Sequence, residues 1–172
     1  MITFSRFKNR FVAKLLVRFP FLAQRFVAAY QPPESGEIPW TPVTKELKES
    51  VVALVTTAGV HHRDQKPFDM KDPNGDPSFR VIDATKPFTD LMITHDYYDH
   101  TDADKDINIV FPVDRLREFE QEGLIGKMAD AHYGFMGHIM GPHLPTLVDK
   151  TAPEIALLLK TTGVDIALLT PG

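Results

Sequence analysis

The chain has 172 residues, of which 43% are hydrophobic and 24% are charged, a composition typical of one folded globular domain that excludes wholesale disorder. A formal net charge of −4 gives no general case for a nucleic-acid partner, and no apolar run reaches the roughly 18 residues of a membrane-spanning helix. Cysteine is absent, which excludes disulfides, thiolate metal sites and a cysteine nucleophile within these residues.

The first 33 residues form a basic segment with six Lys or Arg residues and no acidic residue. Large apolar residues recur in it at helical spacing, which predicts an amphipathic helical arm with a basic opposite face. Pro20 predicts a break, with a second helix that begins there. The apolar stripe comprises Phe4, Phe7, Phe11, Leu15, Phe19, Leu22, Phe26 and Tyr30.

Three roles fit such an arm. It can dock its phenylalanines on its own domain or on a second subunit, lie on an anionic membrane surface, or act as a targeting peptide. We favour docking, because no unbroken apolar core or Ala-x-Ala cleavage site is visible, and we do not expect membrane contact. Residues 31–36 contain tandem prolines and a glycine and are predicted to be a linker. The chain is therefore divided into an arm and linker over 1–36 and a domain over 37–172.

Strands and helices alternate in the predicted domain. Continuous apolar runs predict a buried strand over 51–57, a short strand over 90–94 and a buried strand over 164–170. Amphipathic helices are predicted over 113–122, before Gly123, and over 153–160, with Thr151 as N-cap and Gly163 as stop. This order predicts an α/β fold with a mostly parallel sheet, flanking helices and a ligand site beyond the carboxyl ends of the strands.

The loop expected after the first strand begins with Gly59, which permits a tight exit, and then carries His61, His62 and Arg63. Arg63 could bind a carboxylate with its planar guanidinium. The histidines either line an anionic-substrate site or are ordinary polar loop residues. No glycine-rich nucleotide motif or Walker lysine is present. Residues 67–77 have the turn-forming composition of a long ordered loop.

The loop expected after the second strand has the highest density of ionisable side chains, with two histidines and four aspartates within residues 95–104. It could bind a metal or form a hydrogen-bonded loop in which carboxylates orient histidines. His95, Asp99 and His100 resemble part of the His-x-His-x-Asp-His motif of metallo-β-lactamase-type hydrolases. Tyr97 replaces one ligand histidine of that motif, so a metal site on these three residues is a weak alternative.

A third cluster, residues 132–143, interleaves three histidines with three glycines. The glycines would let backbone approach a ligand or a partner closely, and we include His138 among the candidate site residues. Phe135, Met136 and Met140 are predicted to belong to the core or to an interface.

Several segments in order resemble the selenoprotein B family of glycine, sarcosine, betaine and D-proline reductases. The resemblance covers about residues 38–172 and leaves out the arm. The segments are Ile38-Pro-Trp-Thr-Pro42, Val52-Ala-Leu-Val-Thr-Thr-Ala-Gly-Val-His61, Asp76-Pro-Ser-Phe-Arg-Val81, residues 95–104, Val110-Phe-Pro-Val-Asp-Arg-Leu116 and Phe135-Met-Gly-His138.

The resemblance implies an oxidoreductase that acts on X-H and Y-H to form an X-Y bond with a disulfide as acceptor, cleaving a C–N bond of an amino acid or its N-methylated derivative. It implies a selenocysteine in the full-length product, a pyruvoyl group on a partner subunit or a redox protein partner, and a cytoplasmic setting. The family's Sec/Cys-x-x-Cys motif follows a strand like that over 164–170, so catalytic residues are expected directly after Gly172 and none within the chain.

Selenocysteine is encoded by UGA, which is ordinarily read as stop. We therefore expect the gene to continue through UGA into Sec-x-x-Cys, and the 172 residues to be a prematurely ended fragment. A deliberately cut domain and a genuine short paralogue are the alternatives.

Six of the candidate site residues are expected to converge at one end of the sheet, because both loops leave the carboxyl ends of neighbouring parallel strands; these are His61, Arg63, His95, Asp96, Asp99 and His100. They would lower the pKa of a nearby selenol or thiol and fix a carboxylate substrate. A non-catalytic scaffold subunit, whose arm docks on a catalytic partner, is the main alternative function, and a metal-dependent hydrolase is the second. A homo-oligomer fits each of these. The site residues are His61, His62, Arg63, His95, Asp96, Asp99, His100 and His138.

Overall fold

The computed structural model describes residues 4–28 and 41–172. Its α-helices and strands are α1 (Phe4–Arg18), α2 (Pro20–Ala28), β1 (Val51–Thr56), β2 (Val60–His62), β3 (Arg80–Asp83), β4 (Leu91–Ile93), α3 (Val113–Gln121), β5 (Lys127–Met128), β6 (Ala131–Gly134), α4 (Leu144–Thr146), α5 (Ala152–Thr161) and β7 (Ile166–Thr170). None of the helices in these ranges is long and apolar enough to cross a membrane.

The main sheet is built around β1, which pairs in parallel with three strands. β7 lies along 52–56, while β5 pairs with the start of β1 and β6 with its end. A strand has two edges, so β5 and β6 share the edge opposite β7. β3 extends the sheet by pairing antiparallel with β6. The predicted α/β fold with a mostly parallel sheet is confirmed, and the central position of β1 explains why residues 52–54 are buried.

β2 and β4 lie outside this sheet and form a two-stranded antiparallel sheet of their own. The predicted strand over 90–94 exists, but its expected place beside β1 in a parallel sheet is wrong. Each of these strands has only three residues. Runs so short carry no periodicity that could specify a pairing partner.

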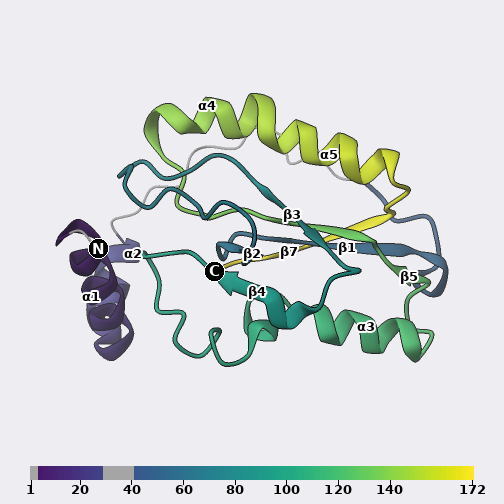
Figure 1. Ribbon diagram of the computed structural model, residues 1–172, viewed down its shortest axis with the longest axis horizontal. Coiled ribbons are helices and arrows are strands. Elements are labelled where there is room, and N and C mark those ends of the chain that lie inside the picture. Colours follow the sequence, from purple (N-terminus) through teal and green to yellow (C-terminus); the bar gives the residue numbers. More distant parts are fainter. Residues whose placement is uncertain (1–3, 29–40) are drawn as a thin grey trace.

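Helices cover both faces of the sheet, with α4 and α5 on one side and α3 on the other (Figure 1). Each side has its own hydrophobic cluster. Leu116 of α3 packs in one cluster with Leu54 and Phe111, and Ile155 of α5 packs in the other with Tyr133 and Met136. The two amphipathic patterns in the sequence therefore mark the two layers that enclose the sheet.

The two domain helices end where they were predicted to end, but one begins earlier. Gly123 and Gly163 follow α3 and α5 with φ angles of 71° and 75°, as glycine at a helix end allows. Thr151 is not an N-cap, because its φ of −72° and ψ of −36° are helical and its side chain caps nothing. The chain is already helical from Leu144 through a π-helical turn, Leu147–Thr151.

β7 is an edge strand, and the prediction that residues 164–170 are buried is wrong. Leu168 and Leu169 are 45% and 71% exposed. The sequence has the continuous apolar run of an interior strand, but within the described residues only β1 pairs with β7. The exposure follows from this missing neighbour rather than from the residue types.

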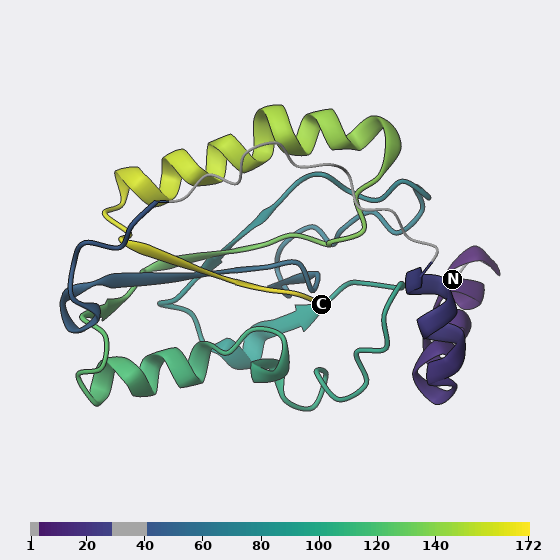
Figure 2. The same ribbon diagram turned by 180° about the vertical axis from the view of Figure 1, so that it is seen from behind.

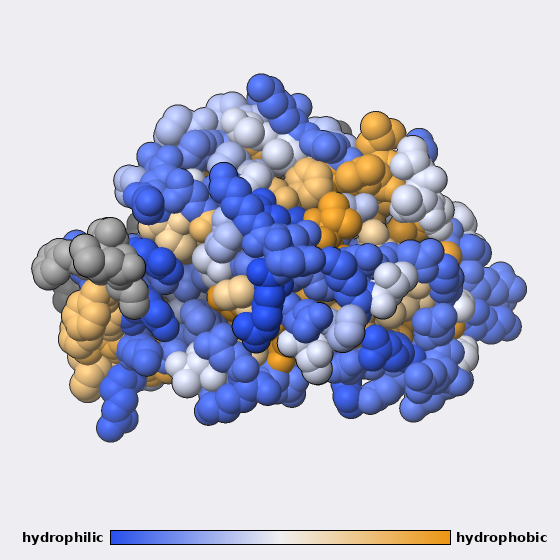
Figure 3. Space-filling view, in the orientation of Figure 1, coloured by the Kyte–Doolittle hydropathy of each residue, from blue (hydrophilic) through white to orange (hydrophobic). Residues whose placement is uncertain are grey.

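The arm consists of α1 and α2, and α2 begins at Pro20 as predicted. Of the two docking alternatives, docking on the chain's own domain is wrong for Phe7, Phe11 and Phe21, which are 66%, 59% and 65% exposed. Docking on a second subunit stays a prediction. Figure 3 shows apolar surface at this end of the molecule. The basic arm instead turns a polar side to the domain, which has 13 basic and 23 acidic residues beyond residue 33. The linker over 31–36, Tyr30 and the side chains of Phe4 and Phe26 lie outside the described residues.

Candidate functional site

The site loop, residues 94–106, follows β4 and is fixed to the end of β1 through Gly59. The N–H of Gly59 donates to the carbonyl of Phe135 (2.7 Å), and its carbonyl accepts from the N–H of Thr94 (2.9 Å). Gly59 has a φ of 76°, and an added Cβ would lie 2.5 Å from the carbonyl oxygen of Thr94. Both the dihedral and the space require glycine, which confirms the predicted tight exit from the strand.

His95 anchors the site loop from within. Its Nδ1 accepts from the backbone N–H of Tyr97 (3.1 Å), and its ring packs against that of Tyr98 with centroids 4.7 Å apart. Burial, and secondly the nearby His138, lower the pKa of His95 to about 4. The ring is therefore neutral at pH 7 and serves to hold the loop in shape.

Asp96 joins the site loop to the arm. Its side chain is 2% exposed, and both carboxylate oxygens receive hydrogen bonds from the guanidinium of Arg6 in α1, with Nη2 3.1 Å from Oδ1. The hydrogen bond with Asp96 raises the pKa of Arg6. A bidentate ion pair thus attaches α1 to the site loop.

His100 and Asp99 play different parts in the site loop. Nδ1 of His100 is 2.9 Å from Oδ2 of Asp104, and its Nε2 is 3.1 Å from the carbonyl oxygen of His95. Both ring nitrogens of His100 are therefore engaged within the site loop. Asp99 accepts from the N–H and hydroxyl of Thr101, and the hydroxyl contact is the main cause that lowers its pKa. Asp99 therefore caps a turn.

These side chains do not assemble a metal site. In residues 4–28 and 41–172, no group of three or more His, Cys, Asp or Glu side chains is placed to hold an ion. His95, Asp99 and His100, the set suggested by the hydrolase motif, are engaged separately with Tyr97, Thr101 and Asp104.

A cavity of about 660 Å³ opens beside the site loop. Two predicted site residues, Arg63 and His100, line it together. Arg63 is exposed, and its guanidinium makes no hydrogen bond or ion pair to any residue in the described part of the chain. The wall mixes both signs of charge with apolar side chains, which suits a small carboxylate or zwitterion. The other charged residues of the wall are Asp104, Lys105, Asp106, Asp114 and Arg117.

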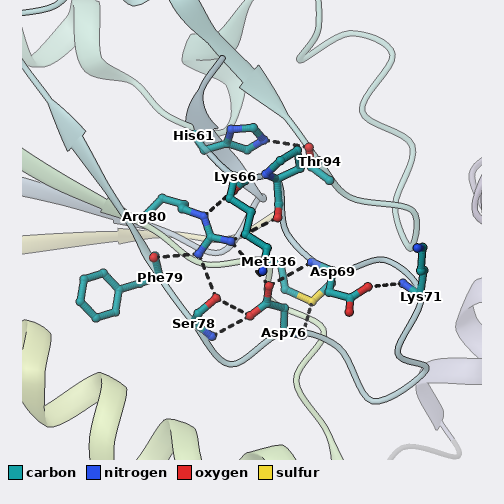
Figure 4. Close-up of polar contacts among 11 residues, drawn as sticks. His61, Lys66, Asp69, Lys71, Asp76, Ser78, Phe79, Arg80, Thr94 and Met136 are labelled. Carbon is teal, nitrogen blue, oxygen red and sulfur yellow. Dashed lines mark hydrogen bonds and ion pairs between the residues drawn. The ribbon is translucent and has the colours of Figure 1, made fainter. Parts of the chain in front are cut away.

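His61 and His62 are strand residues of β2, not loop residues, and are 0% and 2% exposed. Nδ1 of His61 donates to the carbonyl of His62 (2.7 Å), and Nε2 accepts from the hydroxyl of Thr94 (2.8 Å; Figure 4). Burial lowers the pKa of His61. Nε2 of His62 accepts from the N–H of Asp83 (3.1 Å). Both histidines belong to the interior.

The structure therefore divides the predicted site residues into groups. The expected reason for their convergence, two loops that leave neighbouring parallel strands, is wrong because β4 does not lie beside β1 and instead pairs antiparallel with β2 in a separate sheet. Arg63 and His100 share the cavity. His95, Asp96 and Asp99 lie along the loop, and the ring of His61 is hydrogen-bonded to Thr94, the first residue of the loop.

The third cluster reaches the site loop through His138, whose ring stacks on Tyr97 with centroids 3.7 Å apart. Two of its glycines approach the chain's own backbone, because an added Cβ would lie 2.1 Å from the carbonyl oxygen of Val60 at Gly134 and 2.5 Å from that of Thr57 at Gly137. Phe135 and Met136 are in the core as predicted, whereas Met140 is 51% exposed. His132 is fully buried in β6, and burial lowers its pKa to about 4.

Two residues with clear roles were not predicted. The hydroxyl of Tyr98 donates to the carbonyl of Ala58 (3.0 Å), and burial raises its pKa. The guanidinium of Arg80 donates to the carbonyl of Lys66 (2.7 Å) and to the hydroxyl of Ser78 (2.9 Å; Figure 4). It also lies over the ring of Phe68, 4.4 Å from the centroid. A tyrosine between histidines was a visible signal for the first. A lone arginine in a strand gave none for the second.

The carboxyl end of β7 lies beside the same loops. The hydroxyl of Thr170 donates to the carbonyl of Val110 (2.8 Å), and a Cβ at Gly172 would lie 2.5 Å from Cα of Ala58. The carbonyl of Ala58 also accepts a hydrogen bond from the hydroxyl of Tyr98 in the site loop. Ala58 therefore connects the end of the chain after β7 with the site loop.

Comparison with known proteins identifies the family of the chain. The family model described as glycine/sarcosine/betaine reductase selenoprotein B matches residues 5–172. The chain belongs to this family. The selenoprotein B resemblance predicted from the sequence is thus confirmed, and the match extends through most of the arm.

Named relatives in the selenoprotein B family agree. The chain is 48% identical to D-proline reductase subunit gamma of Acetoanaerobium sticklandii over 77% of its own length and 53% of the relative. It is 30% identical to glycine reductase complex component B subunit gamma of Carboxydothermus hydrogenoformans over 86% of its length and 34% of the relative. It is 29% identical to sarcosine reductase complex component B subunit beta of Peptoclostridium acidaminophilum over 62% of its length. The chain thus spans about half or less of these relatives' lengths, and no solved structure gives a significant match.

Proposed function

We propose that the chain is part of an oxidoreductase that reductively cleaves the C–N bond of an amino acid or its N-methylated derivative, with a disulfide as the oxidised product of its electron donor. The observation that carries this proposal is the membership of the selenoprotein B family together with a charged cavity beside the site loop. The relatives' names include reductases of glycine, sarcosine, betaine and D-proline.

The cavity is proposed as the substrate site. Arg63 can grip a carboxylate in bidentate fashion because its guanidinium has no competing partner in the described part of the chain. Asp104 and Asp106 stand on the same wall and can face a substrate ammonium. A volume of about 660 Å³ accommodates an amino acid with room for a group from a partner.

The end of β7 is proposed as the entry point of the redox group. A Sec/Cys-x-x-Cys motif after Gly172 would start against Ala58, where the hydroxyl of Tyr98 is already directed. The hydroxyl of Tyr98 donates to the carbonyl of Ala58, and both ring nitrogens of His100 are engaged within the site loop, so these two side chains would hold the backbone around the motif in place. The selenol of such a motif would supply a nucleophile that is ionised at neutral pH.

The remaining assignments also rest on the family. A partner subunit that carries a pyruvoyl group, or a redox protein, is the proposed partner, since the relatives are named as components of multi-subunit reductase complexes. We propose a cytoplasmic setting, because a selenol–thiol couple needs a compartment that keeps thiols reduced. Assembly of the chain with copies of itself remains part of this proposal.

The test uses the natural gene product with selenocysteine insertion intact, assayed with a dithiol and glycine, sarcosine, betaine or D-proline in the presence of its partner subunits. Consumption of reducing equivalents that depends on the amino acid is expected. We expect Arg63→Ala to raise KM at least about tenfold, the loss of one charged hydrogen-bond pair. Arg115→Ala is the control, because Arg115 pairs with Glu118 on the surface of α3 and should leave KM unchanged.

Two results would contradict the proposal. A product that consumes no reducing equivalents with any of the four substrates indicates a scaffold subunit. At the gene level, a UAA or UAG codon after that of Gly172, or UGA without an in-frame cysteine codon three positions later, removes the proposed redox motif.

A further inference from the structure

The outer edge of β7 combines two properties that are rarely found together. β7 pairs with β1 along 52–56 on one side, and no strand of residues 4–28 or 41–172 pairs with its other side. In Figure 2, β7 runs across the near side of the sheet, between the helices that cover the two faces. Its outward N–H and C=O groups are therefore free to pair with another strand.

The residues of β7 are those of an interior strand. Ile166 and Leu168 lie on one face and Ala167 and Leu169 on the other, and strands that are apolar on both faces are typical of the middle of a parallel sheet. Edge strands are usually protected by Lys, Pro, bulges or inward charges, and residues 166–170 contain none of these residues. Instead, Leu168 and Leu169 are 45% and 71% exposed.

We propose that the outer edge of β7 is a docking surface for one further strand of the same sheet, and that this strand belongs to the polypeptide that the longer relatives carry outside the matched part. Those relatives are about two to three times the matched length, since the match spans 53%, 34% and 36% of three of them. A strand that is apolar on both faces also needs cover on both faces. A continued α/β unit supplies this through its crossover helices.

The residues and the free backbone groups of the outer edge of β7 indicate what kind of strand would pair with it. It is a strand of about five residues that alternates apolar side chains on both faces and pairs through its backbone. The helix that leads into β7 supports an extended interface, because α5 exposes Leu157 to 61%. The strand would turn β7 from an edge into an interior strand and bury both leucines.

Hydrogen–deuterium exchange tests the proposal on two existing proteins, the 172-residue chain and the full-length D-proline reductase subunit gamma of Acetoanaerobium sticklandii. In the chain, we expect the outward-facing amides of β7, which do not pair with β1, to exchange at least tenfold faster than the amides of β1. In the relative, we expect the segment aligned with β7 to exchange as slowly as the segment aligned with β1. Equally fast exchange of the β7 segment in both proteins would overturn the proposal.

A second copy of the chain is the competing occupant, and the same measurement separates it. Protection of β7 that rises with protein concentration in the 172-residue chain, together with dimer formation, would overturn the proposed occupant. No activity is measured, so failure here leaves the proposed reductase function untouched.

A charge at the edge gives an independent check. Leu169→Lys should leave the melting temperature of the 172-residue chain within about 2 °C of wild type, because the side chain of Leu169 is exposed. At the aligned position of the relative, the same substitution should lower the melting temperature by at least about 5 °C, because the charge would be buried there. Val148→Lys is the matched control, since Val148 is 63% exposed away from the edge, and should be neutral in both. A neutral lysine at the Leu169 position in the relative would contradict the proposal.

Discussion

Replacing Gly59 with alanine should release the site loop from the end of β1. Two separate costs arise at this position. The φ of 76° is unfavourable for a residue with a Cβ by about 1–2 kcal/mol, and the new Cβ would lie 2.5 Å from the carbonyl oxygen of Thr94. Relief of that clash moves the loop and strains the hydrogen bond between Thr94 and Gly59, at a further cost of about 1–3 kcal/mol.

Gly123→Ala separates the two costs. Gly123 has a similar φ of 71°, but nothing lies within 4 Å of its added Cβ. Alanine reduces the entropy of the unfolded chain equally in both variants, so that term cancels. For a chain of this size, we expect the melting temperature to fall by roughly 6–14 °C in Gly59→Ala and by roughly 3–6 °C in Gly123→Ala. Differential scanning calorimetry measures both. Equal shifts would refute the argument from close backbone approach.

Three further outcomes are expected. Arg6→Ala should free α1 from Asp96 and raise the rate of limited proteolysis of the arm several-fold. Lys8→Ala is the control, because it removes an arm charge that has no such partner in the described residues, and it should leave the rate unchanged. Equal proteolysis rates in the two variants would show that the ion pair does not hold the arm. The native pKa values of His95 and His132 are about 4, below the unfolded value of 6.5, so unfolding is favoured by proton uptake as the pH falls from 6.5 to 4. Between pH 6.5 and 4, each histidine should lower the free energy of unfolding by about 3 kcal/mol. The free energy of unfolding of His132→Gln, measured with urea, should therefore depend less steeply on pH than that of the wild type. An unchanged pH dependence would contradict this. Tyr98→Phe should lower the free energy of unfolding by about 1 kcal/mol through loss of the hydrogen bond to Ala58, with no change in fold by circular dichroism. A neutral result would show that this hydrogen bond does not stabilise the site loop.

The long elements could be predicted from the sequence, because their patterns determine their burial. The run around Leu54 indicated a central strand, and the amphipathic helices ended at Gly123 and Gly163 as glycine at a helix end dictates. The short elements could not. β2 and β4 have three residues each, so their antiparallel pairing depends on the turn at Gly59 and on tertiary contacts.

The candidate site was predicted in its composition but not in its geometry. The segment from His95 to Asp104 was correctly singled out by its density of polar groups, and Arg63 lines the cavity with His100. His61 and His62 were misplaced because polar residues within a short strand look like a loop. Arg6 and Asp96 lie 90 residues apart in the chain, and no local sequence pattern encodes a contact between residues so distant.

The contacts of Gly59, Gly134, Gly137 and Gly172 with neighbouring backbone have a consequence for how this end of the molecule can vary. At each of these positions a single methyl group would come within 2.5 Å of another main-chain atom. The strand ends are therefore sterically closed to new side chains, whichever substrate a protein of this shape handles. Room for change remains where side chains already border open space, along the cavity wall from Thr89 to Asn108. Altered substrate preference should thus arise by exchange of wall residues around a fixed backbone frame.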